Sequence, residues 1–159
     1  VEIPANSVLE TIGEFALNFK NITEIYFPSS LKELKDGWCS NVKKLEKIII
    51  SPMNNNFIFK EGKYLLGKSD QTKDEFDILL FAPRNIEEVS IPSNIKVISP
   101  YAIENCVNLT KVEIHENSIL ETIGIYALRD IEKIHIPSKI KIISSHTFNQ
   151  FFEMIYYFI

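Results

Sequence analysis

The sequence predicts an α/β solenoid with a parallel β-sheet on one face, short helices on the opposite face and an inserted β-hairpin. Three observations support this fold class. Residues 1–13 (VEIPANSVLETIG) and 112–124 (VEIHENSILETIG) are identical at ten of thirteen positions. A short β-prone segment recurs about every 23 residues, and one of its intervals is much longer than the others. Together these observations indicate stacked copies of one unit with an insertion in the middle.

The recurring segment is a triplet of mostly β-branched or aromatic residues, often followed by proline. Repeats start near residues 1, 25, 48, 89, 112, 134 and 155, which gives intervals of 24, 23, 41, 23, 22 and 21 residues. We expect the triplets to line up as one parallel sheet with strands about 4.8 Å apart. Proline directly after a triplet, as at Pro28 and Pro92, cannot donate to the next hydrogen-bond ladder and so ends the strand.

After each triplet come apolar pairs three residues apart, and then a small residue followed by a large apolar one. Ile95 and Ile98 followed by Ala102-Ile103 are an example. This spacing favours a short helix on the face opposite the sheet. One unit cannot bury its apolar side chains alone, but stacked units bury them for each other, at roughly 1.5–3 kcal/mol per large side chain. Residues 1–159 are therefore expected to form a single repeat domain.

Residues 54–83 fill the long interval and are expected to form a β-hairpin insertion within that domain. Apolar runs separated by Glu-Gly-Lys and by a polar run at 69–73 predict two or three short antiparallel strands. A small satellite core is the expected role of the aromatic residues in this segment, with an adhesive tip as the alternative. These residues are Phe57, Phe59, Tyr64, Phe76 and Phe81.

Composition and charge argue against several classes of function. The net charge is −4, and 17 basic residues are scattered among 21 acidic ones, so no basic footprint for nucleic acid is present. No apolar stretch approaches the roughly 18 residues of a membrane-spanning helix, so membrane insertion is not expected. The apolar end at 154–159 has no polar cap, which suggests a longer array or self-association through this end.

Enzymatic and metal-binding motifs are also missing. Cys39 and Cys106 are too few for a disulfide framework or a thiolate cluster, and we expect both to be buried and unreactive. His115, His135 and His146 show no metal-ligand spacing. The sequence therefore predicts no catalytic residues, no metal and no cofactor.

Alternation along the parallel strands sends the middle residue of each triplet, and the residue before the triplet, to the outer face. This column is the candidate protein-binding surface. The alternative is a solvated face on which Lys and Glu pair across strands. The candidate residues are Glu24, Tyr26, Lys47, Ile49, Glu88, Ser90, Lys111, Glu113, Lys133 and His135, with Met154 and Tyr156 in the last unit.

Two segments have the acceptor pattern for N-glycosylation. They are Asn21-Ile22-Thr23 and Asn108-Leu109-Thr110, so Asn21 and Asn108 are candidate glycosylation sites. Both segments occupy the same position of the unit, and the pattern therefore also arises from the repeat itself.

The chain resembles the BspA-like leucine-rich repeats, whose pattern is an I-x-I-P strand, then I-x-x-I-g-x-x-A-F, then n-C-x-n-L. The matching residues, in order, are Ile91-Pro92, Ile95, Ile98, Ala102-Ile103, Asn105-Cys106 and Asn108-Leu109. The family interrupts its array with a characteristic segment, which Asn54, Phe57, Gly62, Leu65, Leu79 and Pro83 resemble.

This resemblance implies about six leucine-rich repeats that work as a non-enzymatic protein-binding or adhesion module. It also implies a secreted or cell-surface protein, a surface antigen that binds host or matrix proteins. The first alternative is a cytoplasmic leucine-rich repeat scaffold or regulatory subunit, which predicts no glycan, no export and reduced thiols. A hydrolase would need a convergent polar site that the sequence does not show. A structural spacer between adhesive domains is the remaining alternative.

Overall fold

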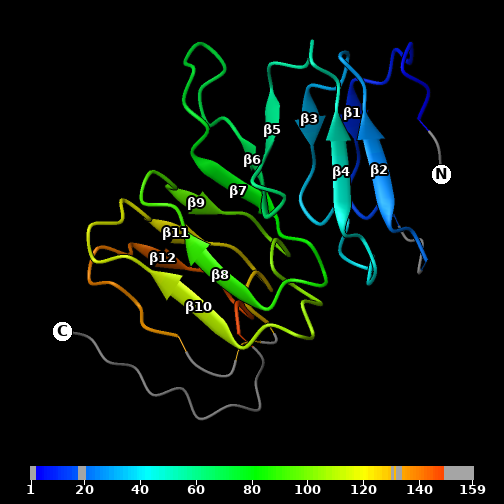
Figure 1. Cartoon of the computed structure of the whole chain (residues 1–159). Helices are drawn as coiled ribbons and strands as arrows, with labels where there is room; N and C mark the ends of the chain where they lie inside the picture. Colours follow the sequence, from blue (N-terminus) through cyan, green and yellow to red (C-terminus); the bar gives the residue numbers. More distant parts are fainter. Residues whose placement is uncertain (1–2, 18–20, 130, 132–133, 149–159) are drawn as a thin grey trace.

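The chain coils into a β-solenoid, seen in a computed structural model that describes residues 3–17, 21–129, 131 and 134–148 (Figure 1). Four of the predicted triplets lie in four-residue strands: β2 (Glu24–Phe27), β4 (Lys47–Ile50), β8 (Glu88–Ile91) and β10 (Lys111–Ile114). β2 pairs with β4 and β8 pairs with β10, in both cases parallel. Ile134 extends the second pair through an isolated parallel bridge to Val112. The triplet at 155–157 and the apolar end at 154–159 lie outside the described residues.

The expectation of one continuous sheet of triplets was wrong, because the described triplet strands form two separate parallel pairs. Figure 1 shows the strands of the insertion between β4 and β8. The hydroxyl of Tyr64, in the insertion, donates to the backbone carbonyl of Ser90 at 2.8 Å and accepts from its N–H at 3.2 Å. The insertion therefore occupies backbone groups of β8 that a neighbouring triplet strand would otherwise bond.

Short strands, not helices, form the opposite face, so the prediction of short helices was also wrong for the described residues. These strands are β1 (Thr11–Ile12), β3 (Glu33–Leu34), β9 (Val97–Ile98), β11 (Thr122–Ile123) and β12 (Ile142–Ile143). β1 pairs with β3, and β11 pairs with both β9 and β12, all parallel. Over the described residues the chain therefore alternates between a face of triplet strands and a face of these short strands.

The corner that follows each of these short strands explains why no helix forms. One residue at each corner has a φ of 52–67°, in the left-handed region that a right-handed helix excludes. The corner residues are Phe15, Gly37, Tyr101, Tyr126 and His146. Hydrogen bonds at the corners are those of tight turns, as from the Ala102 N–H to the Ser99 carbonyl at 3.2 Å. The small-large pairs thus lie in consecutive turns.

The insertion contains three antiparallel strands, β5 (Phe57–Lys60), β6 (Tyr64–Gly67) and β7 (Ile78–Phe81). β7 also pairs in parallel with β9, which gives a six-stranded sheet in the order β12-β11-β9-β7-β6-β5. Asn54 fixes the start of the insertion, because its side-chain amide donates to the carbonyls of Pro28 at 2.8 Å and Leu31 at 2.9 Å. The insertion is thus built into the solenoid and continues the sheet on its second face.

Two clusters of buried side chains make up the core, and β6 contributes to both. Leu65 packs with the cluster formed mainly by residues 12–48, whereas Tyr64 and Leu66 pack with the cluster that extends to Ile136. The expected satellite core was therefore wrong. Phe57, Tyr64 and Phe81 are buried members of the two main clusters, and Phe59 and Phe76 are partly buried against them.

Candidate functional site

The first half of the predicted column lies on β2 and β4, and we call it the β2–β4 patch. Its residues are Glu24, Tyr26, Lys47 and Ile49. Register places Glu24 opposite Lys47 and Tyr26 opposite Ile49. The Lys47 Nζ lies 2.5 Å from Glu24 Oε2, and 37% of Ile49 is exposed. The patch combines an ion pair with an exposed apolar side chain.

The second half lies on β8 and β10, and we call it the β8–β10 patch. Its residues are Glu88, Ser90, Lys111, Glu113 and the exposed His135, which follows the bridge at Ile134. Lys111 lies opposite Glu88, but its Nζ pairs with Glu113 of the same strand at 2.6 Å. The hydrogen bond and the charge of Glu113 raise the pKa of the Lys111 ammonium. Lys133, Met154 and Tyr156 lie outside the described residues.

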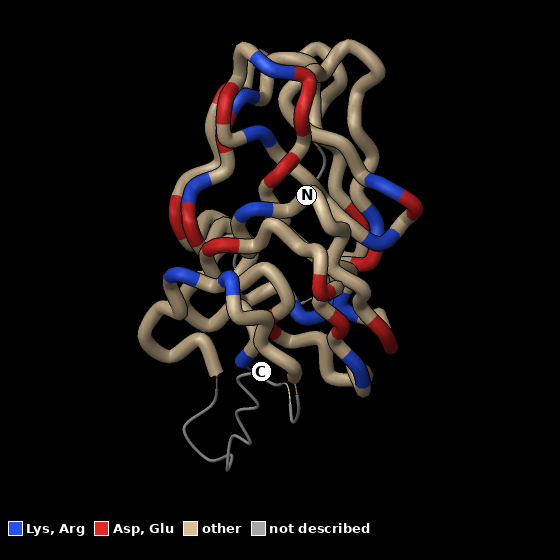
Figure 2. Tube along the Cα trace, turned by 90° about the vertical axis from the view of Figure 1, so that its left-hand side faces the viewer, with Lys and Arg blue, Asp and Glu red and all other residues tan. Residues whose placement is uncertain are grey.

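Charges of both signs are interspersed over the surface (Figure 2). The ion pairs of the two patches are solvent-exposed, and such pairs contribute little to stability. Their charges therefore remain available to a partner without a large cost in fold stability.

A row of aromatic side chains, which the sequence reasoning missed, runs along the corners of the solenoid. We call Phe15, Tyr101, Tyr126 and His146 the corner row. Adjacent ring centroids are 5.8 Å apart for Phe15 and Tyr101, 5.2 Å for Tyr101 and Tyr126, and 5.5 Å for Tyr126 and His146. The rings of Tyr101, Tyr126 and His146 come from successive corners, so their spacings are close to the separation of neighbouring strands.

Gly37 lies at the remaining corner position, between Phe15 and Tyr101. A Cβ atom on Gly37 would come within 2.9 Å of the Phe15 ring and 3.3 Å of the Tyr101 ring. The missing side chain therefore lets the Phe15 ring reach Tyr101 across this corner. The backbone bonds from the Tyr101 N–H to the Ile125 carbonyl and from the Tyr126 N–H to the His146 carbonyl, 3.0 and 3.1 Å, fix the spacing of the other corners.

Charged groups flank the two ends of the corner row differently. At one end the Arg129 guanidinium lies 5.2 Å from the centre of the Tyr126 ring, and its Nη1 is 3.3 Å from Glu104 Oε1. At the other end the exposed carboxylates Glu14 and Asp36 directly precede corner positions 15 and 37. Burial raises the pKa of the Tyr101 phenol, and the nearby charges of Glu104 and Asp36 raise it further.

The sequence does contain a signal for the corner row. An aromatic residue stands directly before the small residue of the small-large pair in Phe15-Ala16-Leu17, Tyr101-Ala102-Ile103 and Tyr126-Ala127-Leu128. The prediction of helices in these segments conceals the row of aromatic residues. Residues one unit apart on short helices are not expected to form a continuous exposed row.

Both cysteines lie in the core beside a buried arginine. Cys39 and Cys106 are both buried, and Arg84 is only 2% exposed. The Arg84 Nη2 lies 3.5 Å from Cys39 Sγ, and its Nη1 lies 3.8 Å from Cys106 Sγ. Burial raises the pKa of the Cys39 thiol to about 12, although the charge of Arg84 opposes the shift. A protonated, enclosed thiol is a poor nucleophile.

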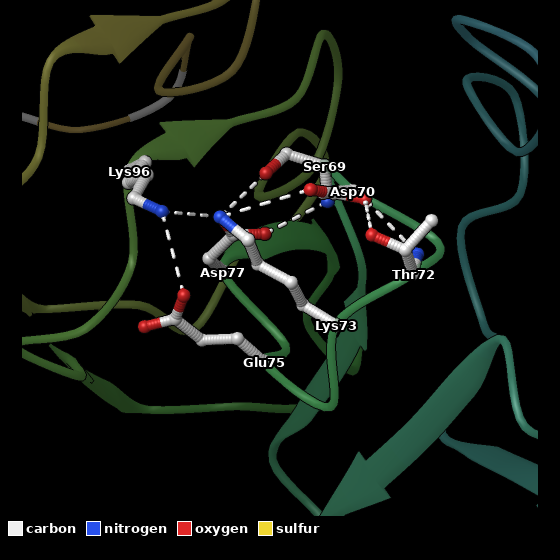
Figure 3. A network of polar contacts seen from close by, with 7 residues as sticks. All are labelled: Ser69, Asp70, Thr72, Lys73, Glu75, Asp77 and Lys96. Atoms are coloured by element: carbon white, nitrogen blue, oxygen red, sulfur yellow. Dashed lines mark hydrogen bonds and ion pairs between the residues drawn. The ribbon is translucent and has the colours of Figure 1, made fainter.

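A polar network ties the loop of the insertion to the solenoid (Figure 3). Asp77 accepts hydrogen bonds from the Ser69 N–H at 2.8 Å, the Ser69 hydroxyl at 2.6 Å and the Lys96 ammonium at 2.9 Å. Burial works against the charged form of Asp77, but the bonds from Ser69 and Lys96 outweigh it and hold the pKa of this carboxyl below its usual value. The loop beyond it has a second pair, in which the Thr72 hydroxyl donates to Asp70 at 2.6 Å.

Among the described residues, no group of three or more His, Cys, Asp or Glu side chains is arranged to hold a metal ion. Within the same residues there is no helix with the length and apolarity that a membrane crossing requires. Asn21 and Asn108, the candidate glycosylation sites, are both exposed. The Thr110 hydroxyl of the second site donates to the Glu87 carbonyl at 3.2 Å.

Three solved structures of bacterial proteins have the same fold. The pneumococcal vaccine antigen PcpA superposes with a TM-score of 0.74 at 26% identity, over 86% of this chain and 33% of that one. A leucine-rich repeat protein from Eubacterium ventriosum gives 0.77 at 24% identity, over 97% and 42%. A leucine-rich cell surface protein from Faecalibacterium prausnitzii gives 0.67 at 20% identity, over 89% and 42%. The chain thus spans less than half the length of each.

Sequence comparison gives the same result at the level of the family. No curated protein matches the chain. Residues 1–63 and 75–158, however, match six copies of the BspA type leucine rich repeat region. The two matched stretches leave out only part of the insertion and the last residue, in keeping with one repeat array interrupted once. The chain therefore belongs to the BspA-type leucine-rich repeat family.

Proposed function

We propose that the chain is a non-enzymatic protein-binding and adhesion module at the cell surface, and that its β2–β4 and β8–β10 patches contact a host or matrix protein. The observation that carries this proposal is the alternation of the triplet strands. Ile25, Val89 and Val112 are buried, and the residues on either side of them face outward in fixed register. Repeat arrays of this kind present extended, rigid surfaces to protein partners.

Similar proteins support the surface location. One of the solved structures is a vaccine antigen and another is a cell surface protein. The family match supports a repeat module for protein interaction. Glycans on Asn21 and Asn108 would agree with export through a secretory pathway, and mass spectrometry of native material would detect them.

A paired charge reversal tests the patches. Lys47→Glu with Lys111→Glu reverses one charge in each patch, and Lys32→Glu with Lys141→Glu makes the same change in net charge elsewhere. Each of these four lysines is exposed and pairs with one glutamate, so the two variants are matched. Binding to immobilised fibronectin, laminin and collagen would be measured by surface plasmon resonance for both variants.

The patch variant should lose binding by about tenfold or more, because like charges across an interface cost several kcal/mol. The control should stay within about twofold, as expected for charges outside the interface. Equal binding of both variants would show that the two patches do not contact the matrix protein. Antibody staining of unpermeabilised cells tests the location, since a signal that appears only after permeabilisation would favour the cytoplasmic scaffold.

A further inference from the structure

We propose that the corner row binds an arginine or lysine side chain of a protein partner, over Phe15 and Tyr101 and beside Glu14 and Asp36. The inference rests on the proposed function, because the cation belongs to a protein ligand. It assigns the ligand to a different surface from the two strand patches, and it names the chemistry that this surface recognises.

Backbone strain is the first argument. Phe15, Tyr101 and Tyr126 have φ values of 52°, 62° and 54°, a conformation that is unfavourable for a bulky residue. Gly37 shows that a glycine fits the same corner without this cost. The ring–ring contacts of the corner row offset this unfavourable backbone energy only in part. Such strain clusters at functional sites.

The second argument is a contact within the chain that already has the proposed chemistry. Arg129 lies on the Tyr126 ring at 5.2 Å from its centre, and Glu104 neutralises the guanidinium at 3.3 Å. A ring of the corner row therefore accepts a guanidinium when a carboxylate stands beside it. Cation–π contacts of this kind are attractive, and more strongly so as the cation is desolvated.

The opposite end of the corner row has an exposed ring and an excess of carboxylates over ammonium groups. Among the described residues, cations lie over the rings of Phe76, Phe81 and Tyr126, and none lies over Phe15 or Tyr101. Phe15 is 51% exposed. The nearby ammonium of Lys35 pairs with Glu33 at 2.6 Å and also feels the charges of Glu14 and Asp36, so three carboxylates surround a single ammonium at this end.

Charge complementarity selects the ligand. Two carboxylates repel an anion and attract a cation, and a guanidinium can stack on a ring while it donates to a carboxylate. An extended basic segment could therefore place one arginine over Phe15 and Tyr101. The corner row runs along successive corners, so the segment would follow the axis of the solenoid.

The probe is the peptide acetyl-Gly-Arg-Gly-Arg-Gly-amide, and its control is the same peptide with citrulline in place of arginine. Citrulline keeps the shape of the side chain and removes the charge. NMR titration would follow the ring resonances of Phe15 and Tyr101. We expect the arginine peptide to shift both sets, and the citrulline peptide to bind about fivefold more weakly or worse.

Matched variants then separate a specific site from general attraction. Glu14→Gln with Asp36→Asn and the control Glu46→Gln with Glu116→Gln change the net charge equally, and all four side chains are exposed. The first pair should lower the affinity for the arginine peptide by about fivefold or more, whereas the control pair should change it by no more than about twofold. Phe15→Leu should also lower the affinity for the arginine peptide. Thermal unfolding of each variant confirms that it folds.

Equal binding of the two peptides, equal effects of the two carboxylate pairs, or no shift at Phe15 and Tyr101 would each overturn the inference. A neutral oligosaccharide that shifts the same resonances when the arginine peptide does not would also overturn it. The variant Lys47→Glu with Lys111→Glu should still bind the arginine peptide. If the matrix protein binds through the strand patches but the arginine peptide does not bind, the proposed function is supported and the corner-row site is rejected.

Discussion

Gly124 is in direct contact with the backbone of Pro100 in the preceding turn. A Cβ atom on Gly124 would lie 2.5 Å from the Pro100 nitrogen, which is closer than real Cβ contacts come. The Gly124 N–H also donates to the Ile98 carbonyl at 2.8 Å, so the two turns cannot easily separate. Gly13 occupies the same position in the first copy of the duplicated sequence, and a Cβ there would meet no atom within 4 Å.

Alanine at these two positions should therefore have opposite effects. Gly124→Ala should lower the free energy of unfolding by about 1–3 kcal/mol, because the turns must move apart. Gly13→Ala should leave it unchanged or raise it by about 0.4–1 kcal/mol, because alanine restricts the unfolded chain. Urea unfolding followed by circular dichroism measures both. Equal destabilisation by the two substitutions would show that the contact with Pro100 does not cause the effect of Gly124→Ala.

Asp77 should stabilise the insertion through its charge. It is 1% exposed and bonded to Ser69 and Lys96 (Figure 3). The neighbouring Asp74 is exposed. At pH 7, Asp77→Asn should cost about 1–3 kcal/mol of unfolding free energy, because an amide cannot satisfy all three donors. Asp74→Asn, the control, should cost about 0–1 kcal/mol. Denaturant unfolding of both variants gives the comparison.

The pH dependence gives a second measurement on the same group. The folded pKa of Asp77 lies below the ordinary value of 3.8, so its contribution is complete above that pH and is lost as the pH falls through the folded pKa. Wild-type stability should therefore decline more steeply below pH 4 than that of Asp77→Asn. Parallel pH profiles would contradict this role.

Arg84 joins parts of the core on both sides of the insertion. Its Nε donates to the Val42 carbonyl at 3.2 Å, and its Nη1 donates to the Ala102 carbonyl at 3.3 Å. Arg84→Met should lower the unfolding free energy by at least about 2 kcal/mol, because buried acceptors left unpaired cost roughly 1–3 kcal/mol each. Arg129→Met removes a half-exposed arginine and should cost about 1 kcal/mol or less. If calorimetry shows a larger loss for Arg129→Met than for Arg84→Met, Arg84 does not hold the two parts of the core together.

The sequence predicted the triplet strands because their signals are local. Alternation around Ile25 and Val89 and proline at positions 28 and 92 mark where β2 and β8 lie and where they end. The prediction of short helices was wrong because the residue types of Phe15 and Tyr126 do not indicate a positive φ, which aromatic residues rarely adopt. Those angles are fixed by stacking between turns, and no single unit reveals them.

The candidate surface was predicted in part for the same reason. Local alternation places Glu24 and Lys111 on the outer face, but it does not show that the insertion separates the two strand pairs. That separation depends on Tyr64 reaching the backbone of Ser90, a contact 26 residues away in the chain. The corner row likewise depends on Gly37 being small enough for Phe15 to meet Tyr101.

Thiol chemistry provides the last prediction. Burial raises the pKa of Cys39 from 9.0 to about 12, so at pH 8 the thiolate fraction alone should slow its reaction with Ellman's reagent about a thousandfold. The Cys106→Ala variant leaves Cys39 as the single thiol. Its absorbance change should be very slow in buffer and rapid in urea, where the core opens.

The raised pKa also has a consequence for stability. The unfolded thiol ionises near pH 9 and the folded one does not, so the contribution of Cys39 is complete below pH 9 and is lost as the pH rises towards 12. Cys39→Ala in the Cys106→Ala background should flatten the decline in stability between pH 8 and pH 11. Reaction of native Cys39 at the rate of free cysteine would mean that Arg84 and the surrounding core do not enclose it.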